Sequence, residues 1–206
     1  ICVLGSDRKM FRTRSGDTIR LNDLVDEAVE RGIAQVRERS PELAPEEQEA
    51  VGQMIGIGAV KYADLSTDRI KDYVFDWDRM LSFDGNTAPY LQYAHARICS
   101  IFRRVGASAG AHPDLVITHP AERSLALRLL GFDQAVSEAL ERFSPHRLCT
   151  YLFDLAQDFT AFYEACPVLH ADDERLRQSR LGLCDLTARI LSHGLGLLGI
   201  DVPERM

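Results

Sequence analysis

The sequence predicts a mainly α protein built around a helical bundle. Beyond residue 20 most apolar residues recur at helical spacing, and short connections between such segments are typical of antiparallel helices in a bundle. The 206 residues are 46% hydrophobic and 27% charged, a globular composition that argues against intrinsic disorder. No apolar run approaches the roughly 18 residues of a membrane span, so we expect no membrane partner.

Residues 1–20 combine a strand pattern with a basic turn. Ile1 to Leu4 indicates the last strand of a unit that began earlier, so we expect a fragment of a longer chain. Residues 8–16 gather Arg and Lys without helical period, and the following Ser-Gly-Asp indicates a turn. The net charge of −7 argues against nucleic-acid binding by bulk charge, but it does not exclude a local basic face.

Two helices are predicted before residue 66. Asn22 is the expected N-cap of a helix over 23–39, which Pro41 ends. Pro45, followed by two glutamates, suits the first turn of a second helix over 45–65. The glycines inside that helix are Gly52, Gly56 and Gly58. Their clustering indicates either a close approach of another backbone or a simple break in the helix.

The rest of the chain predicts one extended segment and a series of helices. Residues 73–75 favour a strand, which the following Asp-Trp-Asp ends. A long helix is expected over 87–105, with Gly106 as its C-terminal glycine, and then a loop over 107–118. Further helices are expected near 119–130, 133–143, 145–165 and 173–194, with a short final piece.

The cysteines and histidines show no metal-binding spacing. The five cysteines are odd in number and contain no Cys-x-x-Cys pair, so a zinc site or a disulfide framework has no support. We interpret them as buried thiols of a reducing compartment. Asp76 and Asp78 form a carboxylate pair, but two carboxylates without further ligands make a weak metal site. We therefore expect no zinc and no other metal ligands in this chain.

Four separated segments resemble arginyl-tRNA synthetases, and they occur in the order found in that family. These segments are residues 11–16, 56–66, 75–97 and 197–206. The resemblance covers essentially the whole chain. It implies that residues 1–85 are the C-terminal edge of a Rossmann-type class I catalytic domain with connecting helices. It also implies that residues 86–206 are the helical anticodon-binding domain.

Two family signatures depart from the usual pattern. The first ATP signature, HIGH, does not occur in the chain. The Asp-Ala-Leu-Arg motif that names the last domain is replaced by Leu-Ala-Leu-Arg at residues 125–128. The resemblance therefore implies a chain that carries the second part of the synthetase.

The resemblance places the second ATP signature, the KMSKS loop, in the basic N-terminal segment. The ATP-binding residues that it implies are Phe11, Arg12, Thr13, Arg14 and Ser15. Arg14 takes the place of the catalytic lysine, and Lys9 is an assisting cation. Adenylate formation needs a mobile cation near the triphosphate, and a guanidinium can supply that charge. From the residues alone, a solvated basic turn is the simpler interpretation.

The resemblance also implies an anticodon-binding set on the long helix and near the C-terminus. Tyr90, Tyr93 and Arg97 share one helical face, and Tyr163 and Met206 match further positions near the anticodon. Aromatic rings give unpaired bases a stacking platform, and arginine supplies positive charge. Packing of the tyrosines inside the bundle is the alternative.

Three further residues are not included in the anticodon-binding set. Some relatives have a tryptophan where this chain has Pro167, which puts a stacking contact there in doubt. Trp77 and Phe83 are interpreted as core residues at the junction of the two domains.

The function implied by the resemblance is that of an arginine–tRNA ligase. Its partners are ATP accompanied by Mg²⁺, L-arginine and an arginine tRNA; a cytoplasmic monomer is expected, without zinc. The alternative is a stand-alone anticodon-binding module without catalysis, since the HIGH-containing part is not in this chain. A third hypothesis is a helical interaction protein of shared ancestry, which would show no anticodon preference.

Overall fold

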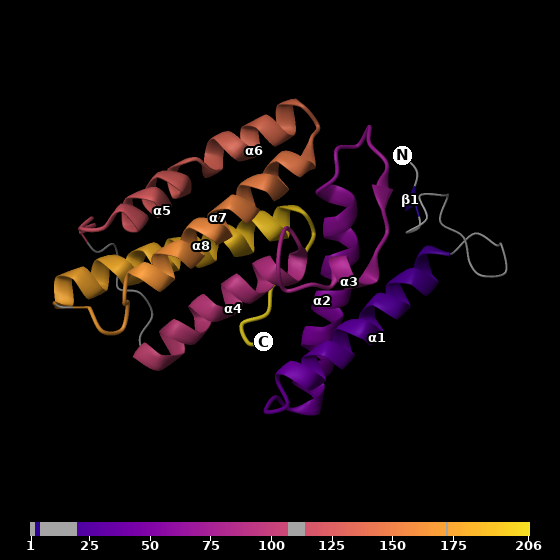
Figure 1. Cartoon of the computed structure of the whole chain (residues 1–206), viewed down its shortest axis with the longest axis horizontal. Coiled ribbons are helices and arrows are strands. Elements are labelled where there is room, and N and C mark those ends of the chain that lie inside the picture. The colour runs from indigo at the N-terminus through magenta and orange to yellow at the C-terminus, as the bar shows by residue number, and fades with distance from the viewer. Residues whose placement is uncertain (1–2, 5–19, 107–113, 172) are drawn as a thin grey trace.

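The computed structural model describes residues 3–4, 20–106, 114–171 and 173–206. In chain order its elements are β1 (Val3–Leu4), α1 (Leu21–Arg39), α2 (Pro45–Leu65), β2 (Tyr73–Val74), α3 (Trp77–Met80), α4 (Ala88–Val105), α5 (Pro120–Leu130), α6 (Phe132–Glu141), α7 (Pro145–Ala165) and α8 (Glu174–Leu197). Figure 1 shows the α1–α2 hairpin at one end of the molecule and the bundle of α4 to α8 at the other. The predicted mainly α fold is confirmed.

The described part of the chain contains one pair of strands. β1 runs parallel to β2, with Val3 opposite Tyr73 and Leu4 opposite Val74. Parallel pairing requires a crossover connection, and the α1–α2 hairpin lies within it. The short strands predicted at the N-terminus and near residue 73 are therefore partners.

Glycines allow α1 and α2 to lie in direct backbone contact. A Cβ atom on Gly52 would lie 2.5 Å from the Cα of Ile33, and one on Gly56 would lie 2.4 Å from the carbonyl oxygen of Ala28. Both distances are too short for real side chains, so only glycine fits at these positions. Of the two interpretations of the glycine cluster, close backbone approach is confirmed for Gly52 and Gly56, whereas Gly58 faces the side chains of Gln92 and Ile200.

Helix boundaries follow local capping, with one clear difference from the sequence. Arg20 and not Asn22 precedes the first turn of α1, and no side chain caps that end, so the predicted N-cap was wrong. At α4 the hydroxyl of Thr87 accepts a hydrogen bond from the Tyr90 N–H at 3.2 Å. Gly106 ends the same helix with a φ of 68°, in the left-handed region that favours glycine.

The main core lies among α4, α7 and α8, with α5 and α6 packed on it. Its fully buried side chains include Leu91, Ile98, Leu152, Leu155, Phe159, Leu191 and Leu195. Burying each such side chain contributes about 1.5–3 kcal/mol relative to exposure. Tyr62 of α2 also enters this core, where its hydroxyl lies 2.6 Å from Asn86 Oδ1 and 3.0 Å from the Cys149 carbonyl oxygen. The hairpin is therefore anchored to the bundle.

A second core lies between the α1–α2 hairpin and the segment of β2 and α3. Its buried members are Val36, Leu43, Val51, Ile55, Ala59, Phe75, Met80 and Leu81. Partly buried Phe83 and Met206 pack against it. The C-terminal residue thus contacts the first half of the chain.

The tail after α8 lies along α4 and is held by side chains of that helix. The hydrogen bonds run from Gln92 to the carbonyl of Asp201 (2.8 Å), from His95 to that of Pro203 (3.1 Å) and from Arg103 to that of Glu204 (2.7 Å). Burial lowers the pKa of His95, which favours the neutral ring, and its Nδ1–H donates to Pro203. These bonds fix the position of Met206 next to the second core.

The described cysteines are free thiols, and three of them are buried. Cys149, Cys166 and Cys184 are 0% exposed, which confirms the buried-thiol interpretation for these three. Burial raises the pKa of Cys149 and of Cys184 to about 12, so both stay protonated at neutral pH. No helix within the described ranges is long and apolar enough to cross a membrane. Those ranges also contain no group of three or more His, Cys, Asp or Glu placed to hold a metal ion.

Candidate nucleic-acid interface

Aromatic and arginine side chains line up across α4 and the elements on either side of it. We call Tyr163, Arg97, Tyr93, Phe83 and Arg39 the aromatic–arginine strip. These residues come from α7, α4, the α3–α4 loop and α1, so tertiary folding brings them together. Three of the five, Tyr93, Arg97 and Tyr163, belong to the anticodon-binding set predicted from the sequence.

At one end of the strip, Arg97 lies on the ring of Tyr163. The guanidinium carbon of Arg97 is 4.1 Å from the ring centroid. Tyr163 is itself supported by Phe159, with ring centroids 6.0 Å apart. Among the described residues Arg97 forms no ion pair, so its charge is offset by the ring face alone. Arg97 is therefore held in place while its N–H groups keep their donor capacity.

At the centre of the strip, Tyr93 is exposed. The residue is 44% exposed, although its helix buries its other face in the core. Phe83 meets it edge to face, with ring centroids 6.3 Å apart and an interplanar angle of 85°. Tyr93 lies one helical turn before Arg97, so the two side chains are neighbours on α4. This placement leaves a tyrosine face open to a stacking partner.

At the other end of the strip, Arg39 lies on the ring of Phe83. Its guanidinium carbon is 4.2 Å from the ring centroid, and Arg39 itself is exposed. The interpretation of Phe83 as a core residue holds in part, because Phe83 packs on the second core and still carries Arg39 and Tyr93. Arg39 has no signal in the sequence: it occupies the last turn of α1, where a basic residue is ordinary.

Tyr90 shares α4 with the strip but is turned toward α7. Its ring centroid is 5.7 Å from that of Phe153, and its hydroxyl lies 3.4 Å from Thr160 Oγ1. The side chain is partly buried against the main core. These contacts favour the alternative that Tyr90 packs inside the bundle.

Met206 packs near one end of the strip, and Pro167 follows α7, the helix that carries Tyr163. Met206 packs against the same core as Phe83, which places it near the Arg39 end. Pro167 is exposed after α7, and its carbonyl oxygen accepts a hydrogen bond from Arg180 at 2.8 Å. A proline side chain has no aromatic ring on which a base could stack.

The strip has the chemistry that unpaired nucleotides require. An exposed aromatic face stacks on any base, and each such contact is worth about 1–3 kcal/mol. Two guanidinium groups without carboxylate partners among the described residues can donate to phosphates or base edges. The strip is therefore a local basic face on an acidic chain, a possibility that the net charge of −7 does not exclude.

The residues predicted to bind ATP lie outside the described part of the chain. These residues are Lys9, Phe11, Arg12, Thr13, Arg14 and Ser15. Their roles stay predictions from the sequence.

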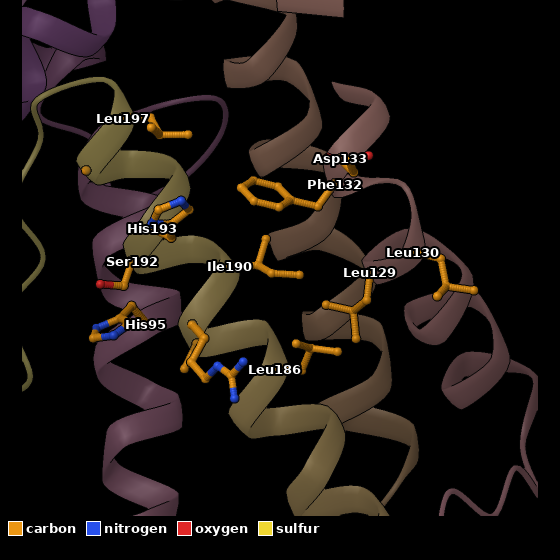
Figure 2. A pocket seen from close by; sticks show the side chains of 13 residues that line it. His95, Leu129, Leu130, Phe132, Asp133, Leu186, Ile190, Ser192, His193 and Leu197 are labelled. Atoms are coloured by element: carbon orange, nitrogen blue, oxygen red, sulfur yellow. The ribbon is translucent and has the colours of Figure 1, made fainter. Parts of the chain in front are cut away.

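A wide groove of about 1160 Å³ runs along α8, away from the strip. Figure 2 shows His95 and Ser192 on one side of it and Leu129 and Leu130 on the other. Its walls are mostly apolar, and its arginine, Arg189, pairs with Asp185 at 3.5 Å. No residue of the strip lines this groove. Without an unpaired cation among its described lining residues, the groove is a poorer site for RNA than the strip.

Comparison with protein families gives two matches that divide the chain. Residues 91–206 match the family described as "DALR anticodon binding domain". Residues 2–77 match the family described as "tRNA synthetases class I (R), catalytic domain".

Individual relatives give similar matches along the whole chain. The sequence is 52% identical over 206 residues to "Arginine--tRNA ligase" of Proteus mirabilis and 57% identical over 205 residues to that of Thermobifida fusca. Each match covers 99% of this chain and 36% of the relative. The chain thus spans about a third of the length of these relatives.

Solved structures share the fold. An arginyl-tRNA synthetase of Thermus thermophilus superposes with a TM-score of 0.89 at 40% identity, over 100% of this chain and 34% of that one. The enzyme of Plasmodium falciparum gives a TM-score of 0.79 at 32% identity, over 91% of this chain and 34% of that one.

Proposed function

We propose that the whole protein is an arginine–tRNA ligase, because this chain belongs to the arginyl-tRNA synthetase family and has its DALR anticodon-binding domain. The relatives at 52% and 57% identity carry that name, and the present chain covers about a third of each. Within that activity, the described residues are assigned the recognition of the tRNA and not the chemical step.

Residues 86–206, with the adjoining Phe83 and Arg39, bind the anticodon arm of an arginine tRNA. The observation that carries this proposal is Tyr93, exposed between two ring-supported arginines on a chain that is otherwise acidic. The loop of an anticodon arm presents unpaired bases, and these are the parts of RNA that proteins read by stacking and hydrogen bonding. Tyr93, Arg97 and Tyr163 are the direct contacts, with Met206 at the edge and Tyr90 as support from the bundle.

The domain boundary is proposed between residues 85 and 86. The two family matches end at residue 77 and begin at residue 91, and the two hydrophobic cores divide in the same interval. Tyr62 and Met206 each pack in the core of the opposite half, which supports a fixed junction between the domains.

The basic N-terminal segment is proposed to take part in the chemistry. Phe11, Arg12, Thr13, Arg14 and Ser15 border ATP, which enters as its Mg²⁺ complex, and Arg14 and Lys9 neutralise the triphosphate as L-arginine attacks. Attack by the arginine carboxylate on the α-phosphorus expels pyrophosphate and leaves arginyl-adenylate, from which the arginyl group passes to the tRNA. No zinc is proposed. A monomer in the cytoplasm is the proposed state.

The test of the chemical role uses the full-length protein. Arg14→Ala should slow adenylate formation by at least about tenfold, since each 1.4 kcal/mol of lost transition-state stabilisation is a factor of ten. Binding of the anticodon arm should be unchanged. Single-turnover adenylate formation at the wild-type rate in this variant would remove Arg14 from the mechanism.

A stand-alone anticodon-binding module remains the second candidate. The match of residues 2–77 to a catalytic domain favours the ligase, because a pure binding module has no use for that segment. Arginylation of tRNA by the full-length gene product separates the two: charging supports the ligase, and binding without charging supports the module.

A further inference from the structure

We propose that Arg39, held on Phe83, binds a backbone phosphate of the nucleotide whose base stacks on Tyr93. This contact lies outside the bundle, on the last turn of α1, and it extends the RNA surface across the domain junction. The inference rests on the proposed anticodon-arm binding and adds a residue and a ligand group to it.

The first support is the geometry of the three side chains. Phe83 contacts both Arg39, at 4.2 Å from ring centroid to guanidinium carbon, and Tyr93, at 6.3 Å between centroids. One phenylalanine thus fixes the guanidinium next to an exposed stacking surface. A nucleotide that places its base on Tyr93 has its own backbone within reach of the neighbouring cation.

The second support is the charge around Arg39. Arg37, two residues earlier on α1, pairs with Glu49 at 3.5 Å, and Arg205 of the tail pairs with Glu47 at 3.9 Å. Arg39 has neither an ion pair nor a hydrogen bond to the described residues. Of these three exposed arginines, Arg39 alone keeps all five N–H donors for a ligand within the described structure.

The third support is the donor geometry of Arg39, which favours a phosphate over a base as its ligand. Phe83 covers one face of the guanidinium, so the N–H groups at its edge are what remain for a ligand. These edge donors match phosphate oxygens in a bidentate geometry. A phosphate would also give Arg39 the ion pair that it does not form with the described residues.

The same arrangement recurs at the other end of the strip, where Arg97 lies on Tyr163 at 4.1 Å. Tyr93 lies between these two ring-supported cations. An extended nucleotide strand that stacks on Tyr93 can therefore meet a cation on each side.

The experiment measures binding of a fluorescent RNA hairpin, the anticodon arm of an arginine tRNA, to the 206-residue chain. Arg39→Ala should weaken binding about tenfold, and its slope of log affinity against log salt should be shallower by about 0.7, the value for one phosphate contact on a single strand. Arg37→Ala is the matched control, because it removes the same charge from the same helix at a paired arginine. It should leave the affinity within about twofold of wild type. Arg39→Lys should recover part of the loss, since lysine binds phosphate as a point charge.

A second series replaces one loop phosphate at a time by an uncharged methylphosphonate. At one loop position the methylphosphonate should weaken binding of the wild-type chain but not of Arg39→Ala. This double-mutant cycle identifies that phosphate as the one that Arg39 contacts. Additive losses at every position would overturn the inference, as would equal effects of Arg39→Ala and Arg37→Ala. Failure of the wild-type chain to bind the hairpin would overturn both the inference and the anticodon-arm proposal; wild-type binding with unchanged Arg39→Ala affinity overturns the inference alone.

Discussion

At Arg97 a single substitution can separate the contribution to RNA binding from the contribution to stability. Its guanidinium rests on Tyr163 and forms no ion pair with the described residues. Both residues are half-buried, and a cation–aromatic contact of this kind is worth about 1 kcal/mol. Loss of Arg97 should therefore weaken RNA binding and leave the fold intact.

Replacing Arg97 by Ala should weaken binding of the anticodon-arm hairpin about tenfold or more, while the free energy of unfolding falls by about 1 kcal/mol at most. Binding is measured by fluorescence anisotropy and stability by urea denaturation. Arg189→Ala is the control, since it removes one charge from the groove on α8. An unchanged dissociation constant in the Arg97 variant would remove it from the interface.

The residues of the strip differ in how far the sequence could predict them. Tyr93, Arg97 and Tyr163 could be identified because they lie in segments that resemble a known family, and helical spacing places two of them together. Arg39 could not, since its partner Phe83 is distant in sequence and only the α1–α2 hairpin brings them into contact. For Tyr90, helical spacing predicts a place on the same helix face as Tyr93 and Arg97. The structure instead shows its ring against Phe153 of the bundle, a contact that spacing alone could not predict.

The start of α5 depends on a buried ion pair. Glu122 is 0% exposed, and it accepts hydrogen bonds from Arg180 at 2.7 Å, from the Thr118 N–H at 2.6 Å and from the His119 N–H at 2.9 Å. Arg180 also donates to the carbonyl of Pro167. One carboxylate thereby ties α5 to α8, and through Arg180 to the chain that follows α7.

The same contacts make stability depend on pH. Burial alone would raise the pKa of Glu122, but hydrogen bonds from Thr118, Arg180 and His119 lower it below its ordinary value of 4.5. A carboxylate with a lowered folded-state pKa stabilises the fold fully above its unfolded pKa, and this stabilisation is lost as pH falls through the folded value.

Glu122→Gln should destabilise the bundle by about 3 kcal/mol at neutral pH, because it leaves the Arg180 charge buried without its partner. The variant should also lose less stability than wild type between about pH 5 and about pH 3, the range in which carboxyl groups ordinarily titrate. Urea denaturation across that range checks both expectations. A variant whose stability matches wild type at neutral pH would show that the pair is dispensable.

The α1–α2 hairpin depends on glycine for a different reason. Gly56→Ala would put a methyl group 2.4 Å from the carbonyl oxygen of Ala28, a backbone atom that can move only with the helix. We expect a loss of about 2 kcal/mol or more in the free energy of unfolding, by the cost of overpacking. Gly196→Ala in α8 is the matched control, since a Cβ there meets nothing within 4 Å. Replacing that glycine should be neutral or stabilising by up to about 1 kcal/mol, and equal destabilisation of the two variants would contradict the packing account.

Across the whole molecule, helix positions were predictable and helix ends less so. The predicted helix over 145–165 matches α7, because Pro145 begins it and its apolar face is continuous. The predicted N-cap at Asn22 failed because α1 begins two residues earlier without a side-chain cap. The short helix α3 has no sequence period of its own; the carboxylate of Asp76 starts it by accepting from the Arg79 N–H at 3.0 Å.

The contacts between the two halves of the chain lie outside any sequence pattern. The tail after α8 is held by Gln92, His95 and Arg103 of α4, and it brings Met206 to the core of the first half. Gln92 also donates to the carbonyl of Met54 at 3.1 Å, so one side chain joins α2, α4 and the tail. The strip crosses this junction, and its geometry therefore depends on both halves.

The most direct test of the account is binding of the 206-residue chain to two hairpins: the native anticodon arm of an arginine tRNA and the same arm with its central anticodon base changed. We predict at least about tenfold tighter binding to the native arm, because a base stacked on Tyr93 lies next to Arg97, whose N–H groups can hydrogen-bond the edge of the native base. Equal affinity for the two hairpins, or no measurable binding to either, would contradict the placement of anticodon recognition in this chain.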